Sequence, residues 1–381
     1  MAGLLAHRRL TAQQIARHAF ASAREVVAWM GAVQAQDYLA AKWALGLRLP
    51  EGSASDAEVE RAIAGGSVVR THALRGTWQL VAPEDLRWIQ ALVRPRLLER
   101  NALMYRRLGL DARAFKRGLE AMEQALRGGD HLTRNELASA LERARVSSRG
   151  LRLTFLLQRA ELEGLICGGT RRGKQFTYAL VDLWVPRARK RRARGEALAA
   201  LARRYFRSRG PATVGDFGWW SGLAAQDARD AVESVRRELE VEEVGERTFF
   251  HAGGRLPPRA KRSAYLLPAY DEYLVAYQSR DAVIDPGHAR RLHPDQSLLD
   301  PVVVLDGHVA GFWRRALGAS SASVELALFE RPSPAGRRAI DEAAERYGAF
   351  LGMPVEIRAL GGRSEKRNGR VEFKDRISTR K

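Results

Sequence analysis

The stretch VVRTHALRGTWQLV (residues 68–81) decides how the first part of this chain folds. Two apolar runs rich in β-branched and aromatic residues flank an Arg-Gly pair at residues 75 and 76. Such runs on either side of a short turn that contains glycine are typical of a β-hairpin. We therefore predict strand, turn and strand over this stretch.

Helix start signals precede this hairpin. Ser22 with Glu25, and Ser55 with Glu58, have the spacing of a capping box, in which a hydroxyl and a carboxylate bind the first free backbone N–H groups of a helix. The first of these helices is expected to be amphipathic and to be closed by the polar run Gln-Ala-Gln-Asp at residues 34–37. Helices followed by a hairpin are the order of elements in a winged helix.

The same order recurs twice along the chain. A second set of helices leads to a hairpin over residues 165–180, and a helix over residues 196–209 begins a third set that ends in a hairpin over residues 241–251. Because the coincidence would have to repeat, three successive units support the interpretation more strongly than one. We predict three tandem winged-helix motifs, at residues 1–110, 111–186 and 187–260.

After residue 261 the sequence changes to short apolar runs that are typical of strands. Asp306 and Gly307 lie between two such runs, which is a strong hairpin signal. One helix is expected over residues 335–350. The fold class is therefore α+β, in which the three winged-helix motifs are followed by a β-rich, barrel-like C-terminal domain (residues 261–360) and a basic, disordered tail (residues 361–381).

The chain is strongly basic. It has 64 Lys and Arg against 44 Asp and Glu in 381 residues, a formal net charge of +20. Such an excess points to a polyanionic partner, with nucleic acid first and an anionic membrane second. A GC-rich genome, which favours Arg and Ala codons, is an alternative cause that needs no partner. No signal peptide and no apolar run of about 20 residues is seen, so we expect a cytoplasmic, nucleoid-associated protein without a membrane partner.

The sequence gives little support for a metal site or a disulfide bond. Cys167 is the only cysteine, which excludes an intramolecular disulfide and a cysteine-based zinc site. His288 and His293 lie near Asp285 and Asp295, but the prolines between them indicate a loop. No phosphate-binding glycine loop is present, and we predict no metal and no other cofactor.

Gln34 and Gln36 are the candidate catalytic residues. A neutral amide is a poor general base, but it can orient water or place a carbonyl oxygen beside a developing cation. That suffices when the leaving group is already activated. A guanine alkylated at N7 is cationic and leaves as a neutral molecule, through a transition state like that of sugar hydrolysis. Asp37 is either a base or a helix cap, and the cap is the preferred interpretation.

Candidate DNA-binding residues lie at the hairpin turns. Arg171, Arg172 and Lys174 are at the tip of the second hairpin, where a wing reaches a groove, and Arg75 is at the turn of the first. The basic segment at residues 187–194 either contacts phosphates or is a solvated linker. Phosphate contacts would set affinity and salt dependence rather than specificity.

The chain resembles the AlkZ-like winged-helix DNA glycosylases, a family that unhooks interstrand crosslinks and excises N7-alkylguanines. The resemblance extends from about Leu10 to Leu360. It rests on five blocks in order, namely QAQD (34–37), LRGTWQLV (74–81) with PEDL (83–86), DFGWWSGL (216–223), LPAYDEYL (267–274), and DG (306–307) through GFWRR (311–315).

The resemblance implies three winged helices in a C shape, a C-terminal β domain, and DNA across the concave face. The family motif is Gln-x-Gln or Gln-x-Asp. Gln34 and Gln36 match the first form, which is associated with producers of DNA-alkylating natural products. Gln79 stands where relatives often have His, so it is a candidate DNA contact that affects substrate preference.

The resemblance therefore predicts a monofunctional DNA glycosylase without lyase activity. Its substrate would be double-stranded DNA with an alkylated or crosslinked guanine, in repair or in self-resistance to a DNA-alkylating natural product. An open face suits bulky lesions that cannot be flipped into a tight pocket. We expect a monomer. The alternative is a non-catalytic winged-helix protein, either a transcription regulator or one that sequesters lesions or a drug.

Overall fold

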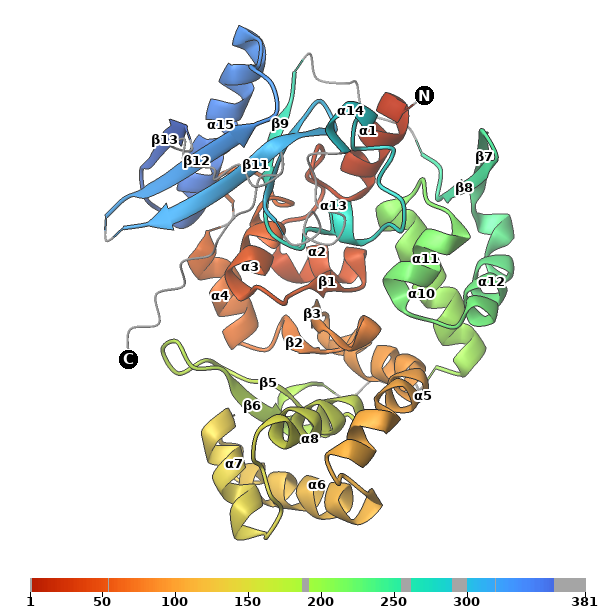
Figure 1. Cartoon of the computed structure of the whole chain (residues 1–381), viewed down its shortest axis with the longest axis vertical. Helices are drawn as coiled ribbons and strands as arrows, with labels where there is room; N and C mark the ends of the chain where they lie inside the picture. Colours follow the sequence, from red (N-terminus) through yellow and green to blue (C-terminus); the bar gives the residue numbers. More distant parts are fainter. Residues whose placement is uncertain are drawn as a thin grey trace.

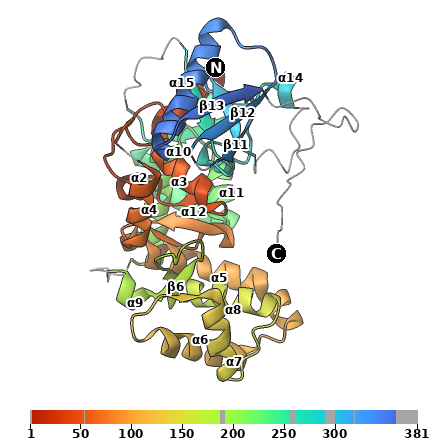
Figure 2. The same cartoon turned by 90° about the vertical axis from the view of Figure 1, so that its left-hand side faces the viewer.

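The computed structural model describes residues 2–53, 55–186, 192–254, 262–289, 300–318 and 320–359. The chain has a mixed α+β fold that is elongated in one direction (Figure 1). The C-terminal sheet lies at one end, the helices of the second unit lie at the other end, and the first hairpin lies between them (Figures 1 and 2).

The first unit contains the predicted helices and hairpin. Its elements are α1 (Ala2–Ala12), α2 (Ala23–Met30), β1 (Val33–Gln34), α3 (Tyr38–Gly46), α4 (Asp56–Ala64), β2 (Val69–His72), the 3-10 turn η1 (Leu74–Gly76) and β3 (Trp78–Val81). The capping boxes at Ser22 and Ser55 are both present. The strands form a three-stranded sheet of order β1-β3-β2, so β1 was missed by the sequence analysis.

Helix α2 ends earlier than we predicted. Gly31 has a φ of 76°, a conformation that favours glycine, and its N–H donates to the carbonyl of Val27. The chain then extends, and Gln34 pairs with Gln79 in antiparallel register. The glutamines therefore do not close the helix, because Gly31 turns the chain into a strand beside the hairpin. The preferred interpretation of Asp37 is confirmed, since it caps α3 by accepting from the Ala40 N–H at 2.9 Å.

A long helix, α5 (Pro83–Arg107), which we did not predict, leads to the second unit. That unit contains α6 (Ala112–Leu126), β4 (Leu132–Thr133), α7 (Arg134–Arg143), α8 (Leu151–Leu162), β5 (Ile166–Gly168), β6 (Thr177–Leu180) and α9 (Val181–Trp184). Strands β5 and β6 are the predicted hairpin, and β4 joins them in the order β4-β6-β5.

The third unit has the predicted helices and a two-stranded hairpin. It contains α10 (Arg194–Arg209), α11 (Val214–Ser221), α12 (Ala225–Ser234), the 3-10 turn η2 (Arg236–Glu238), β7 (Glu240–Val244) and β8 (Arg247–His251). All three predicted hairpins are thus present. The division into three winged-helix motifs with the boundaries given above stays a prediction.

The C-terminal part is an open sheet rather than the barrel that we expected. It contains β9 (Ala264–Leu267), α13 (Glu272–Val275), α14 (Pro286–Ala289), β10 (Val302–Leu305), β11 (His308–Leu317), β12 (Ala322–Leu328), α15 (Pro334–Leu351) and β13 (Val355–Ala359). The strand order is β13-β12-β11-β10-β9, and β12 and β13 are parallel. Parallel neighbours need a crossover, and α15 supplies it and packs on the sheet, which leaves β9 and β13 as separate edges.

The first unit and the C-terminal sheet share one hydrophobic core. Trp43 of α3 donates its indole N–H to the carbonyl of Leu266 in β9 at 2.7 Å, and its ring contacts Tyr347 and Phe350 of α15. This shared core brings the chain just after β9, where α13 begins, against β1.

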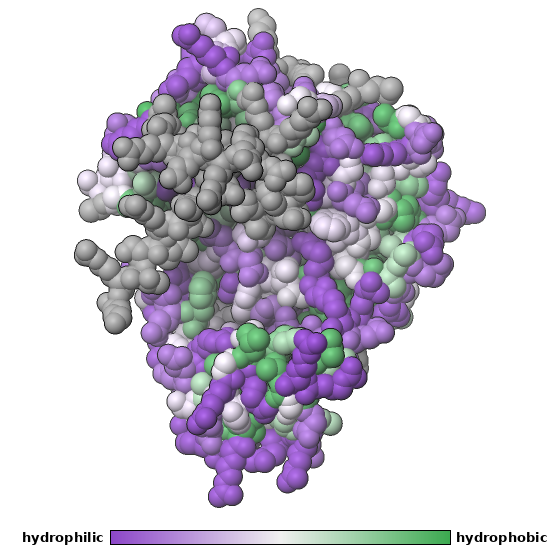
Figure 3. Space-filling model, viewed as in Figure 1, coloured by the Kyte–Doolittle hydropathy of each residue, from purple (hydrophilic) through white to green (hydrophobic). Residues whose placement is uncertain are grey.

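Hydrophilic side chains are spread over the described part of the face shown in Figure 3, with smaller hydrophobic patches between them. Within the residues that the structure describes, no helix combines the length and the apolar character needed to cross a bilayer.

Candidate active site around Gln34

Gln34 lies in the short strand β1 and is only 7% exposed. Its backbone N–H donates to Oε1 of Glu272 at 2.9 Å, instead of to another backbone group. Glu272 is the first residue of α13 and is fully buried. The backbone of Gln34 is therefore anchored to the C-terminal part of the chain.

The side-chain oxygen of Gln34 accepts three hydrogen bonds. The donors are Nη2 of Arg75 at 2.9 Å, Nε2 of Gln79 at 2.8 Å and Oγ1 of Thr77 at 3.2 Å. A carbonyl oxygen has two lone pairs, so three donors occupy it fully. We had expected both glutamines to be able to offer carbonyl oxygens to a sugar cation, but the structure turns the oxygen of Gln34 inward.

Arg75 does not project from its hairpin tip as we predicted for a DNA contact. Its φ is 57°, and its guanidinium turns back to donate from Nη1 to the carbonyl of Trp220 at 2.5 Å and from Nη2 to Gln34. Burial lowers the pKa of Arg75, and the nearby carboxylate of Glu272 raises it. Arg75 thus links the first hairpin, β1 and α11.

Gln79 also has a different place from the one we predicted. It is 1% exposed, and its Nε2 lies 2.8 Å from both Gln34 Oε1 and Thr77 Oγ1. Its own oxygen is buried and has no hydrogen-bond partner among the described residues. The side chain of Gln79 thus contacts Gln34 and Thr77, and its contact with DNA stays a prediction.

Gln36 differs from Gln34 because it is exposed and its side chain makes no hydrogen bond in the described part of the chain. The residue between them, Ala35, is fixed at both ends. Its N–H donates to the carbonyl of Trp78 at 2.8 Å, and its carbonyl accepts from Nη2 of Arg70 at 3.1 Å. The backbone around Gln36 is therefore held, while its amide is open to solvent.

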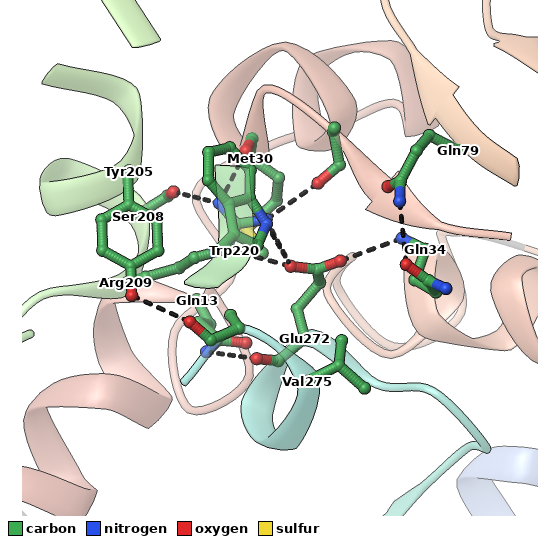
Figure 4. Close-up of polar contacts among 12 residues, drawn as sticks. Gln13, Met30, Gln34, Gln79, Tyr205, Ser208, Arg209, Trp220, Glu272 and Val275 are labelled. Carbon is green, nitrogen blue, oxygen red and sulfur yellow. Dashed lines mark hydrogen bonds and ion pairs between the residues drawn. The ribbon is translucent and has the colours of Figure 1, made fainter. Parts of the chain in front are cut away.

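A buried ion pair supports this arrangement (Figure 4). Oε2 of Glu272 accepts from Nη2 of Arg209 at 2.6 Å and from the indole N–H of Trp220 at 3.0 Å. Arg209 also donates to the carbonyls of Met30 and Ala32. Both charged side chains are 0% exposed, and buried charges need such complete pairing.

The sequence analysis missed this pair. Glu272 and Arg209 lie 63 residues apart, and the residue pattern does not join them. The available signal was that Glu272 stands inside the block LPAYDEYL (267–274), where a charged residue among apolar ones needs a partner.

The tip of the second hairpin is partly folded back onto the first unit. Arg171 lies 3.5 Å from Glu60, and its guanidinium is over the ring of Tyr38. Arg172 pairs with Glu136, and Lys174 is exposed. Of the predicted DNA contacts at this tip, Arg172 and Lys174 are thus at the surface, and Arg171 is near the start of α3.

Other predicted features are only partly described by the structure. His288 lies 3.0 Å from Glu330, while His293 and Asp295 are outside the described residues. In the described ranges no three His, Cys, Asp or Glu side chains form a group able to hold a metal ion. Residues 187–191 of the basic segment and the tail at 361–381 are also outside the described residues.

Comparisons with known proteins agree with one another. The family model described as DNA glycosylase AlkZ-like matches residues 27–350. An interstrand DNA cross-link repair glycosylase from Streptomyces sahachiroi is 27% identical over 353 residues, which are 89% of this chain and 92% of that protein. The solved structure of S. sahachiroi DNA glycosylase AlkZ has the same fold, with a TM-score of 0.75 at 24% identity over 93% of this chain and 98% of that one.

Proposed function

Because this chain belongs to the AlkZ-like DNA glycosylase family, we propose that it hydrolyses the N-glycosidic bond of N7-alkylguanine in double-stranded DNA, including guanines joined in an interstrand crosslink. The crosslink part of the proposal draws support from the name of the S. sahachiroi relative. The single observation that carries the proposal is the pairing of Gln34, buried and oriented by three donors, with Gln36, exposed two residues further on.

The proposed reaction uses water as the nucleophile. The bond between C1′ and N9 breaks, and its electron pair stays on the purine, which neutralises the charge of the alkylated ring. The oxygen of the water bonds to C1′, and the proton of the water passes to solvent. Gln34 and Gln36 position the water, and the free carbonyl oxygen of Gln36 stabilises the sugar cation.

The site suits an activated leaving group and not an undamaged base. The nearest carboxylate in sequence, Asp37, caps α3 and lies 3.9 Å from Arg315, so it is not poised as a general acid. The amides cannot protonate a leaving group. Undamaged purines, which need that proton, are therefore expected to be poor substrates.

The proposal includes monofunctional chemistry without lyase activity. A lyase of the Schiff-base type needs a neutral lysine amine. Lys42 of α3 is the lysine closest in sequence to the glutamines, and its side-chain nitrogen is engaged in ion pairs with Asp56 at 2.7 Å and Glu60 at 2.8 Å. The product is then an abasic site in an unbroken strand.

The proposal also covers the DNA contacts, the oligomeric state, the location and the cellular role of the protein. Arg171, Arg172 and Lys174 would hold DNA phosphates, and the protein would act as a monomer in the cytoplasm, associated with the nucleoid. Its role would be DNA repair or self-resistance to a DNA-alkylating natural product. The alternative, a DNA-binding regulator without catalysis, predicts that function is indifferent to Gln34→Ala.

The test is product analysis with the full-length chain on a duplex that carries one N7-methylguanine. We expect free 7-methylguanine and a strand that breaks only after alkali treatment. Strand breakage without alkali would overturn the monofunctional assignment. Tight DNA binding with no release of base above the spontaneous rate would favour the non-catalytic alternative.

A further inference from the structure

We infer that Arg75 is a positioning residue that holds the amide of Gln34 with its nitrogen toward the substrate, so that Gln34 acts as a hydrogen-bond donor. This inference rests on the proposed glycosylase function. It adds a residue outside the Gln-x-Gln pair and assigns different roles to the two glutamines.

The chemistry of Arg75 fixes the direction of the amide. A guanidinium carries N–H donors and no acceptor. If the amide of Gln34 were turned by 180°, its NH2 group would face Nη2 of Arg75 at the position where Oε1 now lies, 2.9 Å away. Two donors would then oppose each other in a partly buried place. The oxygen of Gln34 must therefore face Arg75.

The position of Arg75 is itself determined by its surroundings. Its guanidinium donates to the carbonyl of Trp220, and its own carbonyl accepts from Nη2 of Arg100. Gly222, at the end of α11, leaves room for it: a Cβ at that residue would lie 3.1 Å from Cγ and 3.3 Å from Cα of Arg75. Both ends of the arginine are thus held by other elements.

The backbone of Gln34 is held as firmly as its side-chain oxygen. Its N–H is bound to Glu272, whose charge is paired with Arg209. In the described part of the chain the amide nitrogen Nε2 makes no hydrogen bond, and in Figure 4 it lies on the side away from Glu272. Nε2 is therefore the polar group of the Gln34 side chain that remains for a substrate.

An amide N–H and an amide carbonyl can together orient one water molecule, because water both accepts and donates hydrogen bonds. The N–H of Gln34 would hold the water through its oxygen, and the carbonyl of Gln36 would accept a hydrogen from the same water. The remaining lone pair of the water is then directed at C1′. Gln36 is free to turn its amide because its side chain is exposed, whereas Gln34 is not.

Gln34→Glu tests the donor role directly. One carboxylate oxygen would still accept from Arg75, Thr77 and Gln79, so we expect the fold, the Tm and DNA binding to be kept. The outward group becomes an oxygen without a proton at neutral pH, and base release from an N7-methylguanine duplex should fall by about 100-fold. The rate should recover as the pH is lowered and the new carboxyl becomes protonated, because its O–H again donates. Gln124→Glu on the exposed side of α6 is the matched control and should change nothing.

Variants of Arg75 test the positioning role. Gln both donates and accepts, so Arg75→Gln no longer sets the direction of Gln34, and kcat should fall about 10-fold or more with little change in KM. Arg75→Lys keeps a donor-only group and should retain more of kcat than Arg75→Gln does.

Three results would overturn the inference. The first is a Gln34→Glu variant with the wild-type rate at neutral pH. The second is an Arg75→Gln variant with a raised KM, a weaker salt dependence and an unchanged kcat, which would make Arg75 a phosphate contact. The third is a wild-type protein that releases no base, which would overturn the proposed function together with this inference, whereas the first two leave the proposed function standing.

Discussion

The guanidinium of Arg75 donates a hydrogen bond of 2.9 Å to the side-chain oxygen of Gln34. This contact joins the turn of the first hairpin to the strand beside it. An arginine that the sequence assigns to DNA is thereby half-buried and turned toward Gln34. The amide of Gln34 is oriented before any substrate binds, and such preorganisation is the condition under which a fixed dipole contributes most to catalysis.

The Glu272–Arg209 pair should be essential for stability. Glu272→Gln would leave the charge of Arg209, which is 0% exposed, without its partner. Breaking a buried pair from one side typically costs about 3–5 kcal/mol, so the free energy of unfolding measured in urea should fall by that order. Glu238→Gln, which breaks the exposed pair with Arg203, is the control and should have little effect. Equal losses in the two variants would contradict this account.

Gly222 and Gly352 offer a matched pair of helix ends. Both cap a helix in the left-handed conformation, with φ of 71° and 68°. Alanine at either position should cost about 1 kcal/mol of stability. Only at Gly222 would the new Cβ meet Arg75, because nothing lies within 4 Å of a Cβ at Gly352. Gly222→Ala should therefore slow base release, and Gly352→Ala should not. Similar rates of base release in the two variants would show that the position of Arg75 does not matter for catalysis.

Lys174 at the tip of the second hairpin should contact a phosphate. Lys174→Ala is expected to weaken DNA binding at low salt and to reduce the slope of log K against log salt by about 1. Release of base at saturating enzyme should stay the same. Lys116→Ala, at an exposed position of α6, is the control. An unchanged slope for Lys174→Ala, measured by fluorescence anisotropy, would remove this residue from the interface.

His18 should make the stability of the protein depend on pH. Burial and the nearby Arg346 lower the pKa of His18 to about 4, whereas an unfolded chain has a value of about 6.5. Between these values the unfolded state binds more protons, so stability present above pH 6.5 is lost as the pH falls toward 4. His18→Gln keeps an acceptor for Arg346, which lies 3.0 Å from Nε2 of His18. In this variant the free energy of unfolding, measured in urea, should fall less steeply between pH 6.5 and pH 4. The same pH dependence in the wild type and the variant would refute the prediction.

Local signals in the sequence were enough to predict much of the fold. The capping boxes at Ser22 and Ser55 depend on residues three apart, and both are present. The three hairpins follow from alternating runs around short turns. Long-range pairing was not accessible in this way. The parallel contact of β12 with β13, at one edge of the open sheet, depends on the crossover through α15 and not on any local pattern.

The candidate site was predicted in its residues but not in its geometry. Gln34 and Gln36 stand out as two amides beside an apolar helix, yet Gly31 ends that helix, so that Gln34 lies in the short strand β1 and Gln36 lies just after it. The roles of Arg75 and Gln79 were assigned from their positions at a hairpin, where exposure is the usual outcome. Gln79 is instead buried and Arg75 half-buried, and the contact of Arg75 with Trp220 of α11 forms only in the folded chain.

The most direct measurement is single-turnover release of base from a duplex with one N7-methylguanine and from a duplex with an N7-linked interstrand crosslink. Wild-type protein would be compared with Gln34→Ala, Gln36→Ala and the control Gln124→Ala. The account predicts release from both substrates and a loss of about 100-fold in each of the first two variants, with DNA binding kept. Wild-type release that neither Gln34→Ala nor Gln36→Ala reduces, or no release at all with DNA binding intact, would contradict it.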